Sequence, residues 1–102
     1  MIELSKDSIK LFELINKKDV DCFYLERKVH QYKAKAKGKQ KEVSKIIFKV
    51  GKTYLDLGPN YKNIILELRE AELITRNKHK STEFFITEKG LDYADTLEEK
   101  SF

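Results

Sequence analysis

The stretch from Tyr61 to Gly90 constrains the fold of this chain more than any other part of the sequence. Ile64, Ile65 and Leu68 recur at helical spacing, which predicts an amphipathic helix. Residues 75–87 follow as a polar, cationic run and then a β-branched and aromatic run, which is the pattern of a hairpin. The sequence therefore predicts a helix, a sharp exit, a basic hairpin and the start of another helix. This order suits a nucleic-acid duplex, because the helix can enter a groove while the hairpin meets phosphates.

The same order resembles the winged helix-turn-helix family, including MarR-like and PadR-like transcriptional regulators. In that family the recognition helix ends in leucine, two residues, alanine, glycine, leucine and isoleucine; here residues 68–74 read LREAELI, with Glu72 in place of the glycine. The hairpin wing closes with threonine, any residue, lysine and glycine, here TEKG at 87–90. The resemblance covers about the C-terminal 45 residues. It implies a mainly α fold with a small β-hairpin wing, and one domain spanning 1–102 whose terminal helical segments dimerise.

Length and composition agree with one small domain that lacks a membrane segment. The chain has 102 residues, and 40% of them are hydrophobic, which allows a single small core. No apolar run reaches bilayer length, and the N-terminus shows no signal-peptide pattern. The lone Cys22 cannot form an internal disulfide. We therefore expect a cytoplasmic protein with no membrane partner.

Charge is distributed unevenly along the chain, although the net charge is only +4. Between Lys28 and Lys52 there are nine lysines and a single acid, Glu42. Between Glu88 and Glu99 there are five acids and one lysine. This asymmetry favours one face for a polyanion and another for solvent or a partner subunit. A solvated, lysine-rich surface is the alternative interpretation of the basic run.

Two helices are predicted before residue 38. The first begins after Ser5, which can cap it, and carries Ile9, Phe12 and Ile15 as an apolar stripe. The second runs from Val20 to Lys37 and ends in the lysine-rich segment 33–41, which has almost no core residues and is expected to fray or to become ordered on DNA. Gly38 is the expected break.

Residues 42–57 fit two structures. Val43, Ile46, Ile47 and Val50 begin a helical stripe that continues to Leu57, and this longer period favours a helix. The same residues also form two apolar runs that flank Gly51-Lys52, which is the pattern of a hairpin. The helix fits more residues, and the hairpin remains open.

The motifs that carry enzyme chemistry are missing from the sequence. Gly51-Lys52-Thr53 ends like a phosphate-binding loop, but Ile46 stands where that loop needs a glycine. His30 and His79 have no cysteine or acid at metal-ligand spacing, and no nucleophile and base can be paired. We expect no enzyme activity, no cofactor and no metal.

The candidate base contacts lie at the start of the predicted recognition helix. If Ile65 and Leu68 face the core, a helical projection puts four residues on the outer side: Asn60, Lys62, Asn63 and Glu67. Lysine can reach guanine and asparagine can pair with adenine, so Lys62 and Asn63 are the base-reading candidates. Asn60 also suits a turn or helix cap.

Candidate phosphate contacts lie in the hairpin and in the preceding segment. The predicted wing contains four basic side chains. Three lysines in the segment before the recognition helix are spaced three or four residues apart, which would place them on one face of a helix. The seven residues are Arg76, Lys78, His79, Lys80, Lys45, Lys49 and Lys52.

The sequence therefore predicts sequence-specific binding of double-stranded DNA by a transcriptional regulator that acts as a homodimer. The dimer is expected because Phe12 and its neighbours, together with Leu91 to Leu97, offer more apolar surface than a small core can cover. The rival interpretation is a winged helix used for protein–protein contact or within a replication complex.

Overall fold

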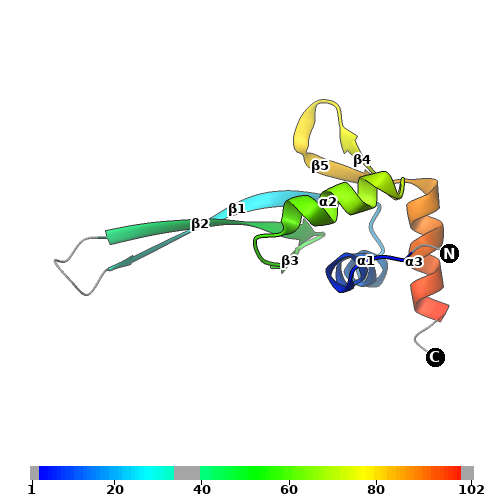
Figure 1. Ribbon diagram of the computed structural model, residues 1–102, viewed down its shortest axis with the longest axis horizontal. Helices are drawn as coiled ribbons and strands as arrows, with labels where there is room; N and C mark the ends of the chain where they lie inside the picture. The colour runs from blue at the N-terminus through cyan, green and yellow to red at the C-terminus, as the bar shows by residue number, and fades with distance from the viewer. Residues whose placement is uncertain (1–2, 34–39, 100–102) are drawn as a thin grey trace.

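The computed structural model describes residues 3–33 and 40–99, which fold into three helices and one five-stranded antiparallel sheet (Figure 1). The strands lie in the order β3-β2-β1-β5-β4. Along the chain the elements are α1 (Lys6–Lys18), β1 (Cys22–Lys33), β2 (Gln40–Val50), β3 (Thr53–Leu55), α2 (Tyr61–Glu70), β4 (Ile74–Asn77), β5 (Lys80–Ile86) and α3 (Glu88–Glu99).

The expectation of a mainly α winged helix-turn-helix fold is wrong, because the five-stranded sheet dominates the described residues. The error lies in residues 20–57, where the sequence predicts two helices and the structure has three strands. Within residues 61–90 the predicted order of elements is confirmed, since α2 is followed by the hairpin β4–β5 and then by α3.

Strand β1 occupies most of the segment that the sequence predicts as a helix from Val20 to Lys37. Leu25 and Val29 lie four residues apart, and this spacing puts two side chains on one face of a strand as well as of a helix. Pairing across strands decides between the two structures, since Phe23 lies opposite Phe84 of β5. These two rings are far apart in the sequence, so the local pattern does not reveal their pairing.

For residues 42–57 the hairpin alternative is correct and the helix is wrong. Strands β2 and β3 are joined by Gly51-Lys52, and Gly51 has a φ of +60°. Glycine at the first position of a two-residue hairpin loop adopts this left-handed conformation without strain. Phe48 and Val50 alternate on one face of β2, and both are completely buried.

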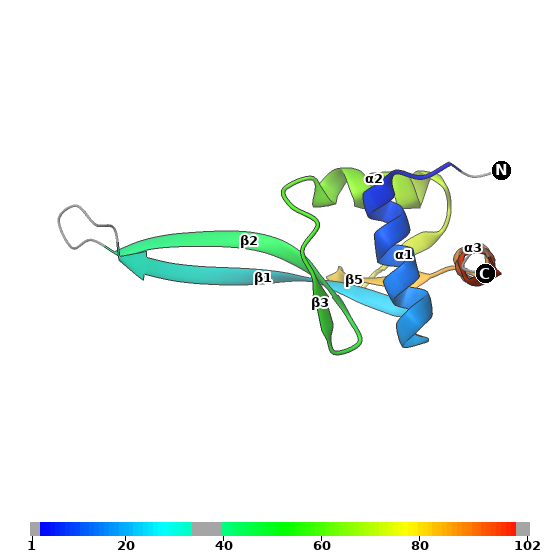
Figure 2. The same ribbon diagram turned by 90° about the horizontal axis from the view of Figure 1, so that it is seen from below.

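Most of the β1–β2 hairpin extends beyond the rest of the sheet. Strand β1 pairs with β5 only through residues 22–24, and β2 pairs with β3 only through residues 48–50. Residues 26–33 and 40–47, here called the ribbon, therefore pair only with each other in the described chain. Figures 1 and 2 show the ribbon projecting away from the helices. The predicted break at Gly38, and most of the lysine-rich segment 33–41, lie outside the described residues.

The helices cover one face of the sheet. Phe23 stacks on Phe84, with ring centroids 5.3 Å apart, and packs against Phe48 at 5.8 Å. These rings belong to the same buried cluster as Leu11 of α1 and Leu68 of α2. Because side chains alternate along a strand, their neighbours in sequence lie on the opposite face. We call these two surfaces the helix side and the open face.

Helix α1 begins where the sequence predicts, and its first turn is tied to α2. The hydroxyl of Ser5 accepts a hydrogen bond from the backbone N–H of Ser8. The carboxylate of Glu67 accepts hydrogen bonds from the backbone N–H and hydroxyl of Ser5, each at 3.0 Å, and from the hydroxyl of the buried Ser8. The helical projection that turns Glu67 outward is therefore wrong, because Glu67 caps α1.

We expect Glu67→Gln to lower the free energy of unfolding at pH 7 by about 1–2 kcal/mol, because charged hydrogen bonds are replaced by neutral ones. Partial burial raises the pKa of Glu67, but the hydrogen bonds from Ser8 and Ser5 outweigh burial and leave this pKa below its ordinary value. The contribution is therefore complete above the unfolded-state pKa of about 4.3, and it disappears as pH falls through the folded-state pKa.

Urea unfolding at pH 7 and pH 3 measures this difference. We expect the gap between wild type and Glu67→Gln to shrink at pH 3. Glu70→Gln, at an exposed position of the same helix, is the control and is expected to change stability little at either pH. A gap of equal size at both pH values would contradict the role of the carboxylate charge.

The exit of α2 keeps a tight turn although it lacks glycine. Glu72 has a φ of +62°, which is the left-handed conformation that glycine adopts most easily. The carbonyl of Glu72 accepts a hydrogen bond of 2.7 Å from the hydroxyl of Thr87. Thr87 in turn accepts a hydrogen bond from the N–H of Gly90 and caps α3. The threonine and glycine of the 87–90 motif thus join α3 to the end of α2.

The apolar stripes of α1 and α3 pack against each other within one chain. Phe12 is completely buried, and its ring meets that of Tyr93 edge to face at 5.5 Å. These stripes therefore give no support to the homodimer, which stays a prediction, and Phe12→Asp would disrupt the core of the chain itself. Within the described residues, none of the helices has the length and apolar character needed to cross a bilayer.

Candidate nucleic-acid interface

A groove lies on the helix side between α2 and the hairpin β4–β5. Its volume is about 400 Å³. Lys62 and Arg69 border it from α2, and Arg76 borders it from β4. No carboxylate is among the lining residues, so these three cations give the groove a positive potential. The full lining is Leu25, Tyr61, Lys62, Ile65, Leu66, Arg69, Arg76, Ser81 and Phe84.

The geometry of the groove follows from two features of α2. Ile64 and Leu68 anchor the helix in the core, and Lys62, Leu66 and Arg69 lie on the side of the helix that turns away from these two residues. Lys62 and Arg69 lie seven residues apart, which places them on the same face two turns from each other. Between them, Leu66 is 54% exposed and gives the groove an apolar floor.

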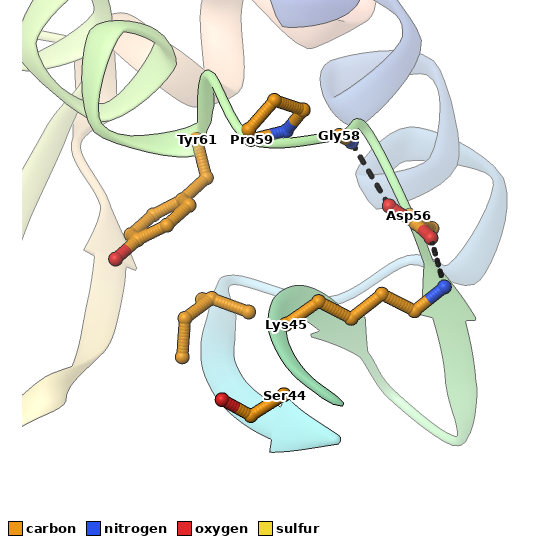
Figure 3. Close-up of a pocket in the computed structure, with 7 residues that line it drawn as sticks. Ser44, Lys45, Asp56, Gly58, Pro59 and Tyr61 are labelled. Carbon is orange, nitrogen blue, oxygen red and sulfur yellow. Dashed lines mark hydrogen bonds and ion pairs between the residues drawn. The ribbon is translucent and has the colours of Figure 1, made fainter. Parts of the chain in front are cut away.

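A second hollow of about 420 Å³ continues the groove toward the ribbon. Tyr61 lines both cavities, and Ser44 of β2 lies across the second hollow from it (Figure 3). Ile46 of β2 also lines the second hollow. On the same side of the ribbon, the guanidinium of Arg27 donates a hydrogen bond of 3.3 Å to the hydroxyl of Ser44. The helix side of the ribbon, the start of α2 and the hairpin β4–β5 thus border adjoining cavities.

The structure brings together only two of the predicted DNA-binding residues, Lys62 and Arg76, in the groove. Asn63 is exposed on α2 but does not line the groove. Asn60 is the capping position of α2, and its side chain makes no capping hydrogen bond. Lys78 and His79 form the exposed β4–β5 turn, in which the N–H of His79 donates to the side-chain oxygen of Asn77.

The other predicted DNA-binding residues lie away from the groove. Lys45 forms an ion pair of 2.6 Å with Asp56 at the edge of the second hollow, and Figure 3 shows its side chain turned toward that carboxylate. Hydrogen bonds from Lys45 and from the N–H of Gly58 lower the pKa of Asp56. Lys49 and Lys80 lie over the rings of tyrosines on the open face. Lys52 is exposed in the β2–β3 turn, so the helical face predicted for these lysines does not exist.

Sequence reasoning missed Arg69 and Arg27 as members of the cationic surface. Arg69 could have been found from the sequence, because it follows Lys62 by seven residues and therefore lies on the same face of the helix two turns later. Nothing local indicates Arg27, since its place on the helix side depends on the pairing of β1 with β2.

Comparison of the chain with known protein families, with curated proteins and with solved structures found no match. The function is therefore argued from the geometry and chemistry of the surface.

Proposed function

We propose that this protein binds double-stranded DNA through its helix side, as a cytoplasmic, sequence-specific regulator. The observation that carries the proposal is the groove in which Lys62, Arg69 and Arg76 converge without a carboxylate. Guanidinium groups bind phosphates through paired hydrogen bonds, and cations on one surface recruit a polyanion. The exposed side of α2 offers Lys62 and Asn63 to base edges, and Arg76 meets the backbone.

The ribbon supports this proposal because it has little value for the fold itself. A two-stranded hairpin without a third strand or a covering helix is marginally stable in water. With twelve residues, β1 spans about 40 Å, and most of that length lies beyond its pairing with β5. A two-stranded ribbon has the dimensions to lie in a DNA groove, and the sequence from Lys33 to Lys41 supplies five lysines.

The rival function is a docking module for another protein. The free edges of the ribbon favour it, since an exposed strand edge can accept a strand from a partner. The two functions differ in their response to salt. Binding to DNA releases counterions and weakens steeply as salt rises, whereas strand pairing is driven by main-chain hydrogen bonds.

A charge-removal experiment tests the proposal. We expect the double variant Arg69→Ala, Arg76→Ala to bind a labelled duplex of about 20 base pairs at least about tenfold more weakly at low salt. The slope of log K against log salt should become shallower by about 0.9 for each phosphate that the protein no longer neutralises, or about 1.8 for both arginines. Fluorescence anisotropy at four salt concentrations gives both quantities.

The matched control is Lys17→Ala, Lys18→Ala, which removes the same charge from exposed positions at the end of α1. Its salt slope should stay close to that of the wild type. Equal slopes for the two double variants would show that the groove does not hold the duplex. Binding that does not depend on salt would favour the protein partner.

A further inference from the structure

The open face of the sheet carries exposed aromatic rings with lysines beside them. The pairing of β1, β2 and β3 places Tyr24, Lys49 and Tyr54 in one row across three strands. Adjacent strands are about 4.8 Å apart, so the two tyrosines lie about 10 Å from each other with Lys49 between them. Tyr54 is 44% exposed, and Phe85, one row further along β5, is 40% exposed.

Three lysines lie over these rings. The Nζ of Lys28 is 4.0 Å from the centroid of Tyr54, and that of Lys49 is 5.8 Å from the same centroid. The Nζ of Lys80 is 5.1 Å from the centroid of Tyr24. A shallow hollow of about 450 Å³ opens beside Tyr24, and Lys49 and Lys80 are among its lining residues.

Two of the carboxylates near this row already have partners. Glu83 accepts a hydrogen bond of 2.5 Å from the amide of Asn77, and hydrogen bonding to Glu83 raises the pKa of the Tyr24 hydroxyl to about 12. Asp56 is paired with Lys45. The charge of Asp56 is balanced by Lys45, whereas Glu83 keeps its charge because its hydrogen bonds lower its pKa, and Glu26 also lines the hollow. The three lysines over the tyrosines therefore outnumber the two remaining carboxylates.

We propose that the open face binds single-stranded nucleic acid, with bases stacked on Tyr54 and Tyr24 and phosphates held by Lys28, Lys49 and Lys80. Aromatic rings interleaved with cations are the surface that single strands recognise, whereas a closed duplex hides its base faces. A base stacked on an aromatic ring is held more strongly than an ammonium group in an exposed cation–π contact. A base therefore displaces the lysine from the ring, and the lysine then reaches the adjacent phosphate.

This surface is distinct from the helix-side groove, so the two can be tested separately. The probe is a labelled oligothymidine of about 15 nucleotides, long enough for several stacked bases. We expect Tyr54→Ala to weaken its binding by about tenfold, and Tyr54→Phe to preserve it, because the ring alone stacks. The control is Leu91→Ala, which removes an exposed apolar side chain from α3 and should leave oligothymidine binding unchanged.

Tyr54 lies in the three-residue strand β3, so its replacement could also disturb that strand. Lys49→Ala is therefore a second variant, and it keeps both tyrosine rings. It should reduce oligothymidine affinity several-fold and make the salt slope shallower by about 0.7. Wild-type protein that does not bind the oligothymidine would overturn the proposal. A second pair of results would also overturn it: normal oligothymidine binding by Tyr54→Ala together with loss of oligothymidine binding by the double variant Arg69→Ala, Arg76→Ala. The oligothymidine would then occupy the helix-side groove. Duplex affinity is measured with the same variants, so failure of duplex binding would refute the proposed function alone.

Discussion

Shortening the ribbon is expected to weaken duplex binding by about 10- to 100-fold at low salt while the fold is kept. Lys28 and Lys45 are paired across the ribbon, so a short turn containing asparagine and glycine can join them in place of residues 29–44. The replaced segment holds five lysines and one acid. Its deletion removes five of the cations that we propose to meet phosphates, and it removes no residue of the buried core.

Two measurements separate binding from folding in this variant. Circular dichroism and thermal unfolding should show a melting temperature close to that of the wild type, since the ribbon pairs only with itself among the described residues. Anisotropy with the duplex should show the weaker affinity and a shallower salt slope. A shortened protein that binds the duplex as tightly as the wild type would remove the ribbon from the interface.

The second large effect is expected from Gly90→Ala, which should destabilise the protein by about 3 kcal/mol. A Cβ at position 90 would lie 2.2 Å from the carbonyl oxygen of Leu73 and 2.7 Å from the Cγ2 of Ile86. The Leu73 carbonyl cannot move away freely, because it accepts a hydrogen bond from the N–H of Thr87. In an ordinary helix the same substitution stabilises the protein by about 1 kcal/mol. The sign of the change in stability therefore shows whether the close approach of Gly90 to the Leu73 carbonyl exists.

Thermal unfolding measures this effect. For a domain of this size, about 3 kcal/mol corresponds to a fall in melting temperature of roughly 12–24 °C. Asp95→Ala is the control, because Asp95 is exposed in the same helix and alanine there only improves helix propensity. A Gly90→Ala variant as stable as the wild type would mean that α3 does not approach the Leu73 carbonyl this closely.

The parts of the fold that depend on local signals could be predicted from the sequence. The cap at Ser5 and the sequence of helix, hairpin and helix over residues 61–90 were readable because capping chemistry and hydrophobic period act over a few residues. The turn at Gly51 also has a local signal, but the helical spacing of the apolar residues in 42–57 led to the prediction of a helix there.

The remaining fold could not be predicted, because distant partners decide it. Strand propensity depends strongly on the neighbours across the sheet, and for Phe23 that neighbour is Phe84, sixty-one residues later. The ribbon has almost no core face, so it lacks the alternation that marks a half-buried strand. Much of the candidate site was missed for the same reason: the sequence places Lys45 and Lys49 on a helix, whereas in β2 Lys45 pairs with Asp56 and Lys49 lies on the open face beside Tyr54.

The central claim is that duplex DNA lies against the helix side, and backbone NMR shift mapping tests it most directly. Amide resonances of a ¹⁵N-labelled sample are followed during titration with a short duplex. We expect the largest shifts at Lys62, Leu66, Arg69 and Arg76, and small shifts along Leu91 to Leu97 of α3. Shifts confined to α3, or no shifts at a saturating duplex concentration, would contradict the account.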